Sequence, residues 1–228
     1  MSALWAKGGL FEKLRDACKE SWESYVDHAF ARGLGDGTLS AESFKHYLVQ
    51  DYLFLIHYAR AWALASYKAD NLADMRFANE SVKAILDAEM GLHVKYCESW
   101  GIPSADIETY EEAEATLAYT RFVLEAGHQG DILDLAVALA PCALGYAEIA
   151  ARLNAAPYRR IDGNPYNAWI GMYAGPEFRA VARGTADFVD RLWTARAGGA
   201  RFESLATTFD RACRLEASFW RMGLERAS

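Results

Sequence analysis

The protein has 228 residues, a length that suits one or two domains with a sizeable hydrophobic core. Hydrophobic residues make up 52% of the chain and aromatic residues 13%, a composition that excludes a disordered protein. The net charge is −7 at pH 7 and the lysines and arginines are scattered, so we expect no nucleic-acid partner.

The four cysteines form no CxxC pair, so neither a zinc knuckle nor a thioredoxin-type redox motif is indicated. We expect free thiols in a reducing compartment. The first residues lack a basic flank followed by an apolar core, and no stretch reaches ~18 uninterrupted apolar residues. A cytoplasmic protein without a membrane span is therefore expected.

Helical spacing dominates the apolar pattern, whereas alternation of period two is hard to find. The spacing predicts helices over 8–32, 41–69, 72–101, 108–127, 131–154, 176–197 and 201–224. Pro176 stands where the first turn of a helix should begin. Because most connections are short, we predict one all-α domain over residues 1–228, an antiparallel bundle of about seven long helices.

The second predicted helix carries an acid within its apolar stripe. Asp51 has Tyr47 four residues before it and Leu55 four residues after it, so it shares their buried face. A carboxylate there is costly unless it is paired, hydrogen-bonded or protonated. It can be a structural group that accepts a bond from a buried tyrosine or tryptophan, or part of a polar pocket.

The third predicted helix contains EMGLH, which places Glu89 and His93 four residues apart on one face. A helical ion pair is the favoured interpretation and a metal pair the alternative. The histidines are otherwise spread over the first 128 residues, Glu-x-x-His motifs on opposite helices, as a di-iron bundle needs, are absent, and so is HExxH. We therefore predict no metal site.

The fifth predicted helix has no charged residue from Leu135 to Ala147, yet it contains Pro141 and Cys142 side by side. The proline should kink the helix. Tyr146 shares the face of Cys142, and the small Gly145 should leave room near the sulfur. A buried cysteine acting as a small hydrophobe is the alternative to a reactive thiol beside a cavity.

The last predicted helix repeats the anomaly of the second, because Glu216 lies in its apolar stripe. Two buried acids on separate helices suggest a shared polar pocket, although each could be structural. Burial raises the pKa of a thiol above its usual ~8.5, and carboxylates do not lower it. A pocket holding Cys142 and acids therefore predicts proton transfer from the thiol to a carboxylate.

Five stretches, in order and with similar gaps, resemble TenA, the thiaminase II family. They are GDGTLSAESFKHYLVQD, QDYLFL, LAPCALGYAE, NAWIGMYAGPEF and LEASFW. The resemblance covers nearly the whole chain and implies a haem-oxygenase-like all-α fold, a homotetramer and no cofactor. It also implies hydrolysis of the C–N bond at the exocyclic methylene of 4-amino-5-aminomethyl-2-methylpyrimidine, and of thiamine, which yields 4-amino-5-hydroxymethyl-2-methylpyrimidine for thiamine salvage.

By the same resemblance, Cys142 matches the nucleophile of the cysteine-containing branch and Glu216 the proton donor. Asp51 matches a carboxylate that binds the pyrimidine. Four more residues match positions that contact the substrate in the family: Tyr146, Tyr173, Tyr119 and Phe54.

Three positions depart from some relatives. Phe54 replaces a tyrosine, so it can stack on the substrate but cannot tune the thiol by a hydrogen bond. Ala143 and Gly145 replace bulkier residues, which should widen the pocket.

Other classes of function stay open at this point. The same aromatic rings and acids could bind a thiamine-related pyrimidine without turnover, in a binding or regulatory protein. A haem- or iron-using oxygenase on the same fold is disfavoured by the distribution of histidines. A purely structural helical module is disfavoured by three polar groups in the core.

Overall fold

The computed structural model describes residues 4–196 and 200–225, and the regular structure of these residues is entirely helical. The elements are α1 (Leu10–Ala17), α2 (Lys19–Val26), α3 (Ala29–Asp36), α4 (Ala41–Lys68), α5 (Leu72–Ala84), the π-helical turn η1 (Ile85–Glu89), α6 (Met90–Ser99), α7 (Ser104–Ile107), α8 (Glu114–Gln129), α9 (Ile132–Ala155), α10 (Asn167–Ala174), α11 (Pro176–Arg196) and α12 (Arg201–Glu225). The predicted all-α bundle is confirmed.

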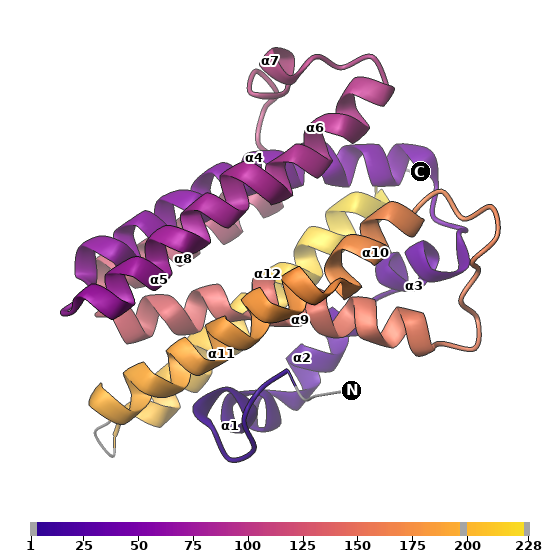
Figure 1. Ribbon diagram of the computed structural model, residues 1–228. Coiled ribbons are helices and arrows are strands. Elements are labelled where there is room, and N and C mark those ends of the chain that lie inside the picture. The colour runs from indigo at the N-terminus through magenta and orange to yellow at the C-terminus, as the bar shows by residue number, and fades with distance from the viewer. Residues whose placement is uncertain (1–3, 197–199, 226–228) are drawn as a thin grey trace.

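The centre of the bundle is α9, which packs against α8, α10, α11 and α12 and also contacts α4. Figure 1 shows α5 and α6 along one side of the molecule and α11 along the other. A helix that is apolar on all sides must be buried, and nearly every side chain of α9 is. In the described part of the chain, α9 alone is long and apolar enough to cross a membrane, but 89% of its most apolar window is buried in the fold.

The prediction of one continuous helix over 8–32 is wrong. This part of the chain forms the three short helices α1, α2 and α3. The backbone leaves helical geometry at Cys18 and again at Asp27. These turns let Trp22, Tyr25 and Phe30 all point into the core, where each is almost fully buried. Since neither break contains glycine or proline, the sequence carries no local signal for either break.

The predicted helix 72–101 is interrupted by η1, where the N–H of Met90 donates to the carbonyl of Ile85, five residues back. The predicted helix 108–127 begins later than expected, with α8 at Glu114. The expected connection 155–176 contains a further helix, α10, while α11 begins at Pro176 as predicted. Residue 197, the predicted last residue of that helix, lies outside the described residues.

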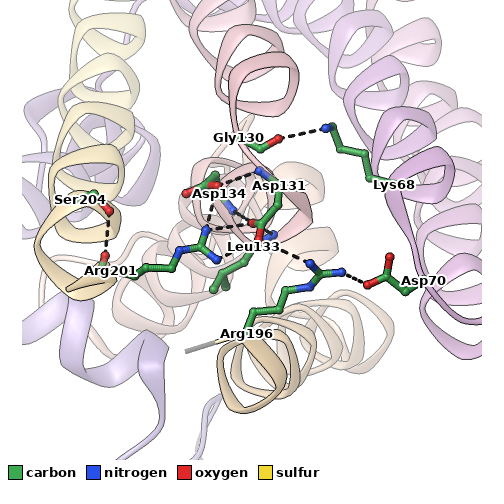
Figure 2. A network of polar contacts seen from close by, with 9 residues as sticks. All are labelled: Lys68, Asp70, Gly130, Asp131, Leu133, Asp134, Arg196, Arg201 and Ser204. Atoms are coloured by element: carbon green, nitrogen blue, oxygen red, sulfur yellow. Dashed lines mark hydrogen bonds and ion pairs between the residues drawn. The ribbon is translucent and has the colours of Figure 1, made fainter. Parts of the chain in front are cut away.

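A network of charged side chains holds several helix ends together (Figure 2). Asp131 caps α9 in a capping box with Asp134. Arg201, at the start of α12, donates to Asp131 at 2.8 and 3.0 Å and to Asp134 at 2.8 Å. Arg196, at the end of α11, reaches Asp131 and also Asp70, which follows α4. The network therefore joins the ends of four long helices.

Candidate active site

A cavity of about 560 Å³ lies between the α5–η1–α6 side of the bundle and the α10–α11 side, with α4 and α9 forming its inner wall. The size is typical of sites for small organic ligands. The walls are formed by Tyr58, Trp62, Ser81, Ala84, Ile85, Asp87, Ala88, Glu89, Gly91, Leu92, Lys95, Cys142, Ala143, Gly171, Met172, Gly175, Glu177, Phe178, Val181 and Thr185.

The thiol of Cys142 lies on the inner wall of this cavity and is only 8% exposed. Burial raises its pKa well above the usual value, and the nearby acids Glu216, Glu89 and Asp51 raise the pKa further. The hydroxyl of Tyr58, within hydrogen-bonding reach, lowers the pKa of the thiol and opposes this effect. The sulfur therefore carries its proton in the free protein, as the sequence predicted, and needs a base to become a nucleophile.

Glu216, on α12, is 2% exposed and accepts a hydrogen bond of 2.8 Å from the hydroxyl of Tyr119, on α8. Burial raises the pKa of Glu216 to about 8, with a further contribution from the charge of Asp51. Near neutral pH this carboxyl group holds a proton and can donate it. The Tyr119 bond ends on Oε1, so the proton belongs on Oε2.

Asp51, on α4, is 3% exposed, and its Oδ2 accepts bonds from Tyr47 at 2.9 Å and from His93 Nε2 at 2.7 Å. The other ring nitrogen of His93 lies 2.9 Å from the carbonyl oxygen of Glu89. Because both ring nitrogens face acceptors, the geometry assigns an imidazolium. Burial would lower the pKa of His93, but Asp51 and the Glu89 carbonyl raise it above its usual value.

The predicted ion pair between the side chains of Glu89 and His93 does not form. His93 turns to Asp51 instead, and the carboxylate of Glu89 accepts a bond of 2.9 Å from the hydroxyl of Tyr173, on α10. Both partners, Asp51 on α4 and Tyr173 on α10, come from other helices, so tertiary contacts replace the pair expected within one helix. Burial and the charge of Asp51 raise the pKa of Glu89 to about 7.

The predicted tyrosines extend the polar core of the site. The hydroxyl of Tyr146 lies 3.3 Å from that of Tyr47, which also accepts a bond of 3.2 Å from Trp169 Nε1. The rings of Tyr146 and Tyr173 are tilted at a centroid distance of 4.9 Å. A single connected set of rings and hydroxyls thus runs from Asp51 towards α10.

Phe54 stacks on Tyr119 at a centroid distance of 4.9 Å and on Tyr58 at 5.5 Å. It cannot hydrogen-bond the thiol, but the hydroxyl of Tyr58 one turn later can. Tyr58 also donates to the carbonyl of Leu139 at 3.1 Å, on the helix that carries Cys142. The polar group that Phe54 lacks is therefore supplied by its neighbour on α4.

Of the seven predicted site residues, one lines the cavity and six do not. Cys142 lies on the wall, whereas the others are buried in the core around it: Asp51, Phe54, Tyr119, Tyr146, Tyr173 and Glu216. Asp51 and Glu216 both affect the pKa of Cys142, so the two acids and the sulfur share one electrostatic environment.

The expectation that Gly145 leaves free space is wrong. A methyl group at Gly145 would lie 2.1 Å from the ring of Tyr25, on α2, so that ring fills the space. Ala143, by contrast, does line the cavity.

The sequence interpretation missed Tyr58 and Glu89 as wall residues and Tyr47 as the link between Asp51 and Tyr146. Tyr47 and Tyr58 lie in the apolar stripe of α4 and read as core side chains. Glu89 was assigned to a helical ion pair. The signal available was the phase of Tyr58, which places its hydroxyl on the buried face that also carries Asp51.

Within residues 4–196 and 200–225, no three side chains of the types His, Cys, Asp and Glu are grouped as ligands for a metal ion. The four cysteines are buried and free. The chemistry that this arrangement supports is acid–base and nucleophilic, with a buried thiol, a protonated carboxyl group and an aspartate–imidazolium pair.

Known proteins resemble the chain over most of its length. An aminopyrimidine aminohydrolase of Halalkalibacterium halodurans is 36% identical over 212 residues, covering 92% of each chain. Its namesake in Helicobacter pylori is 31% identical over 204 residues, 90% of this chain and 93% of the other.

The same resemblance holds for a solved structure. A crystal structure described as a TenA family transcription regulator from Silicibacter has a TM-score of 0.89 and 42% identity, covering 95% of this chain and 97% of that one. The pattern of the TENA/THI-4/PQQC family matches residues 15–226, so the chain belongs to this family.

Proposed function

We propose that this protein is an aminopyrimidine aminohydrolase of the thiaminase II type, a hydrolase acting on C–N bonds. Its substrate would be 4-amino-5-aminomethyl-2-methylpyrimidine, and the product would be the hydroxymethylpyrimidine used in thiamine salvage. The observation that carries the proposal is the thiol of Cys142 on the wall of a cavity, with Glu216 and Asp51 close enough to change its pKa. The names of the two relatives with 31% and 36% identity support the same reaction.

The first step in the proposed mechanism is addition of the sulfur of Cys142 to the ring carbon next to the substituted one. The thiol proton passes to a carboxylate, for which Asp51 is the candidate, and the electron pair of the broken ring double bond moves to a ring nitrogen. Both of these bonds of Asp51 end on Oδ2, which leaves Oδ1 for the donor edge of the ring. Since Asp51 lies behind the cavity lining, the mechanism requires the ring to enter deeper than the present wall. The imidazolium of His93 balances the charge of Asp51.

The second step is loss of the amine. The electrons of the adduct return to form the exocyclic double bond as the C–N bond breaks, and the nitrogen leaves protonated, with Glu216 as the proton donor. Water then adds at the methylene carbon and gives a proton to Glu216, the S–C bond breaks, and the thiolate recovers its proton from Asp51. Covalent catalysis thus divides one difficult displacement into easier steps.

Ammonia release from the aminomethylpyrimidine, compared between wild type and Cys142→Ser, tests this function. A hydroxyl is a far poorer nucleophile than a thiol at this position, so we expect turnover to fall by at least about a thousandfold. The circular dichroism spectrum should not change. Turnover at the wild-type rate in Cys142→Ser would contradict the mechanism.

The second candidate is a pyrimidine-binding protein without turnover, and the description of the Silicibacter neighbour as a transcription regulator favours a test of it. Tight binding of the pyrimidine without release of ammonia would identify this function. The charge of −7 does not favour nucleic acid as its partner.

Three further expectations belong to the same proposal. The protein would act as a homotetramer, without a cofactor, in the cytoplasm. They follow from the family resemblance and from the sequence, and they stay predictions. The preference between the two substrates can be measured by comparing ammonia release from the aminomethylpyrimidine with cleavage of thiamine.

A further inference from the structure

Glu89 lines the cavity together with Cys142, whereas Asp51 and Glu216 do not. Of these three acids, Glu89 is therefore the one best placed to meet a ligand directly.

Two independent features of the chain orient Glu89. Tyr173, on α10, donates a hydrogen bond of 2.9 Å to Oε1, which leaves Oε2 for a ligand. Glu89 is also the last residue of η1, and π-helical turns of this kind are frequent at functional sites. The turn places Glu89 among the residues that line the cavity, while its carbonyl oxygen faces the imidazole of His93.

The charges around the cavity favour a cation. The ionisable groups on its walls, apart from the tyrosine and the thiol, are Asp87, Glu89 and Glu177, with Lys95 as the one base. Asp87, Lys95 and Glu177 are exposed, whereas Glu89 is half-buried. A carboxylate removed from water interacts more strongly with a cation than an exposed one does.

We propose that Glu89, oriented by Tyr173, binds the protonated amino group on the exocyclic methylene of the substrate. The ammonium then passes one proton to Glu89, and Glu216 returns a proton to the nitrogen as the C–N bond breaks, so the amine leaves as ammonia. The assignment rests on the proposed function, because the ring must lie against Cys142 for its substituent to lie beside Glu89. Glu89 is then a substrate-binding residue that distinguishes the cationic aminomethyl substrate from the neutral hydroxymethyl product. The product would leave more readily than the substrate for this reason.

The pKa of Glu89 allows it to be ionised when a cation binds. Burial and the charge of Asp51 raise its pKa to about 7, while His93 and the bond from Tyr173 oppose this rise. An ammonium group bound at the carboxylate would stabilise the ionised form and lower the pKa again.

The test compares two ligands that differ at one group. Calorimetric titrations at pH 7.5 would use Cys142→Ser protein, which does not turn over, with the aminomethyl and the hydroxymethyl pyrimidines. We expect Glu89→Gln in this background to weaken binding of the aminomethyl ligand by about tenfold or more. Binding of the hydroxymethyl ligand should change by less than about twofold, which also shows that the variant is folded.

Two further variants make the result specific. Glu80→Gln removes an exposed acid from the neighbouring helix α5 and should leave both affinities unchanged. Tyr173→Phe keeps the charge of Glu89 but removes its hydrogen-bond donor, so it should weaken the aminomethyl ligand more than the hydroxymethyl ligand. If Glu89→Gln fails to fold, the Tyr173→Phe comparison decides the question.

Equal losses for both ligands, or no loss for either, would overturn the assignment of Glu89 and leave the proposed function standing. If the Cys142→Ser protein binds neither pyrimidine, the proposed function fails and the assignment fails with it. A selective loss of the aminomethyl ligand supports both.

Discussion

The ionisable side chains of the site lie in different environments, and these environments give them different protonation states. Burial keeps the proton on the thiol of Cys142 and on Glu216 at neutral pH, because it raises the pKa of each. The imidazolium of His93 keeps its partner Asp51 in an ion pair. Carboxyl groups with different environments can serve as acid and base in one reaction, as the proposed mechanism requires.

The protonated state of Glu216 predicts how activity depends on pH. Glu216 can donate a proton only while it holds one, so we expect kcat/KM of the wild type to fall as the pH rises through about 8. Glu216→Gln should lower kcat at least about tenfold with little change in KM, and this fall above pH 8 should disappear. The pH–rate profiles of the two proteins, with Glu203→Gln on the exposed face of α12 as control, measure this.

The same pKa predicts an effect on stability of known sign. The folded pKa of Glu216 lies above its unfolded value, so its contribution to stability is complete below about pH 4.3 and is lost as the pH rises towards 8. Glu216→Gln should therefore be more stable relative to wild type at pH 9 than at pH 5. A stability difference that does not depend on pH would contradict the burial of this carboxyl group.

At the residue scale, the sequence could identify the polar groups that interrupt apolar stripes, and all of Asp51, Cys142 and Glu216 are buried as expected. It could not identify Tyr58 or Glu89, because their roles depend on side chains from other helices. The charged partner of Asp51, His93, also lies on a different helix, α6. Helical spacing describes one face of one helix and carries no information about what packs against it.

At the scale of the helix, small residues on α9 let its neighbours approach closely. Gly145 is the clearest case, because the ring of Tyr25 occupies the position of its missing methyl group. Tyr25 also donates to the carbonyl of Pro141 at 3.4 Å, one turn before Gly145. The side of α9 that faces α2 is therefore closed, and the cavity lies elsewhere around the helix.

This packing predicts that Gly145→Ala destabilises the protein. The added methyl would lie 2.1 Å from a ring carbon of Tyr25 in a packed core, and overpacking of this kind costs about 1–3 kcal/mol. Denaturant unfolding, followed by circular dichroism, gives the change in the free energy of unfolding. Gly91→Ala is the control, since no atom lies within 4 Å of the added methyl and alanine favours the helix. Equal stability of the two variants would show that Tyr25 moves aside easily.

Helix prediction succeeded where one stripe runs without interruption and failed where tertiary packing redirects the chain. The predicted helices 41–69 and 131–154 agree with α4 and α9 to within a residue or so. The breaks at Cys18 and Asp27 have no local sequence signal, because they form so that successive segments can bury their aromatic side chains. The gain comes from contacts with other helices, which the periodicity of the segment itself cannot contain.

At the scale of the whole molecule, the charged network of Figure 2 joins helices that are far apart in sequence. Partial burial raises the pKa of Asp131, but hydrogen bonds from Arg201 and from backbone N–H groups hold it well below its usual range. A depressed carboxyl pKa stabilises the fold above the unfolded pKa of about 3.9, and this contribution is lost as the pH falls below it.

We therefore expect Arg201→Ala to lower the free energy of unfolding by about 1 kcal/mol at pH 7, since the pairs it breaks are partly exposed. The difference from wild type should shrink as the pH falls below about 4. Thermal unfolding at several pH values measures it. Arg214→Ala, which breaks a more exposed pair with Asp210, should have little effect at any pH. A similar loss in both variants would mean that the network adds nothing beyond ordinary surface pairs.

The π-helical turn at Ile85–Glu89 has a consequence for how this chain tolerates changes in length. Deleting a single residue within it would leave a continuous α-helix from α5 into α6, with a better set of backbone bonds. Because such a turn takes up one extra residue, the helix on either side would keep its phase after this deletion. A deletion in the regular helix α9 meets no such turn, so it would rotate every side chain beyond it by about 100° relative to those before it. The chain should therefore tolerate the loss of one residue at Ile85–Glu89 better than in α9.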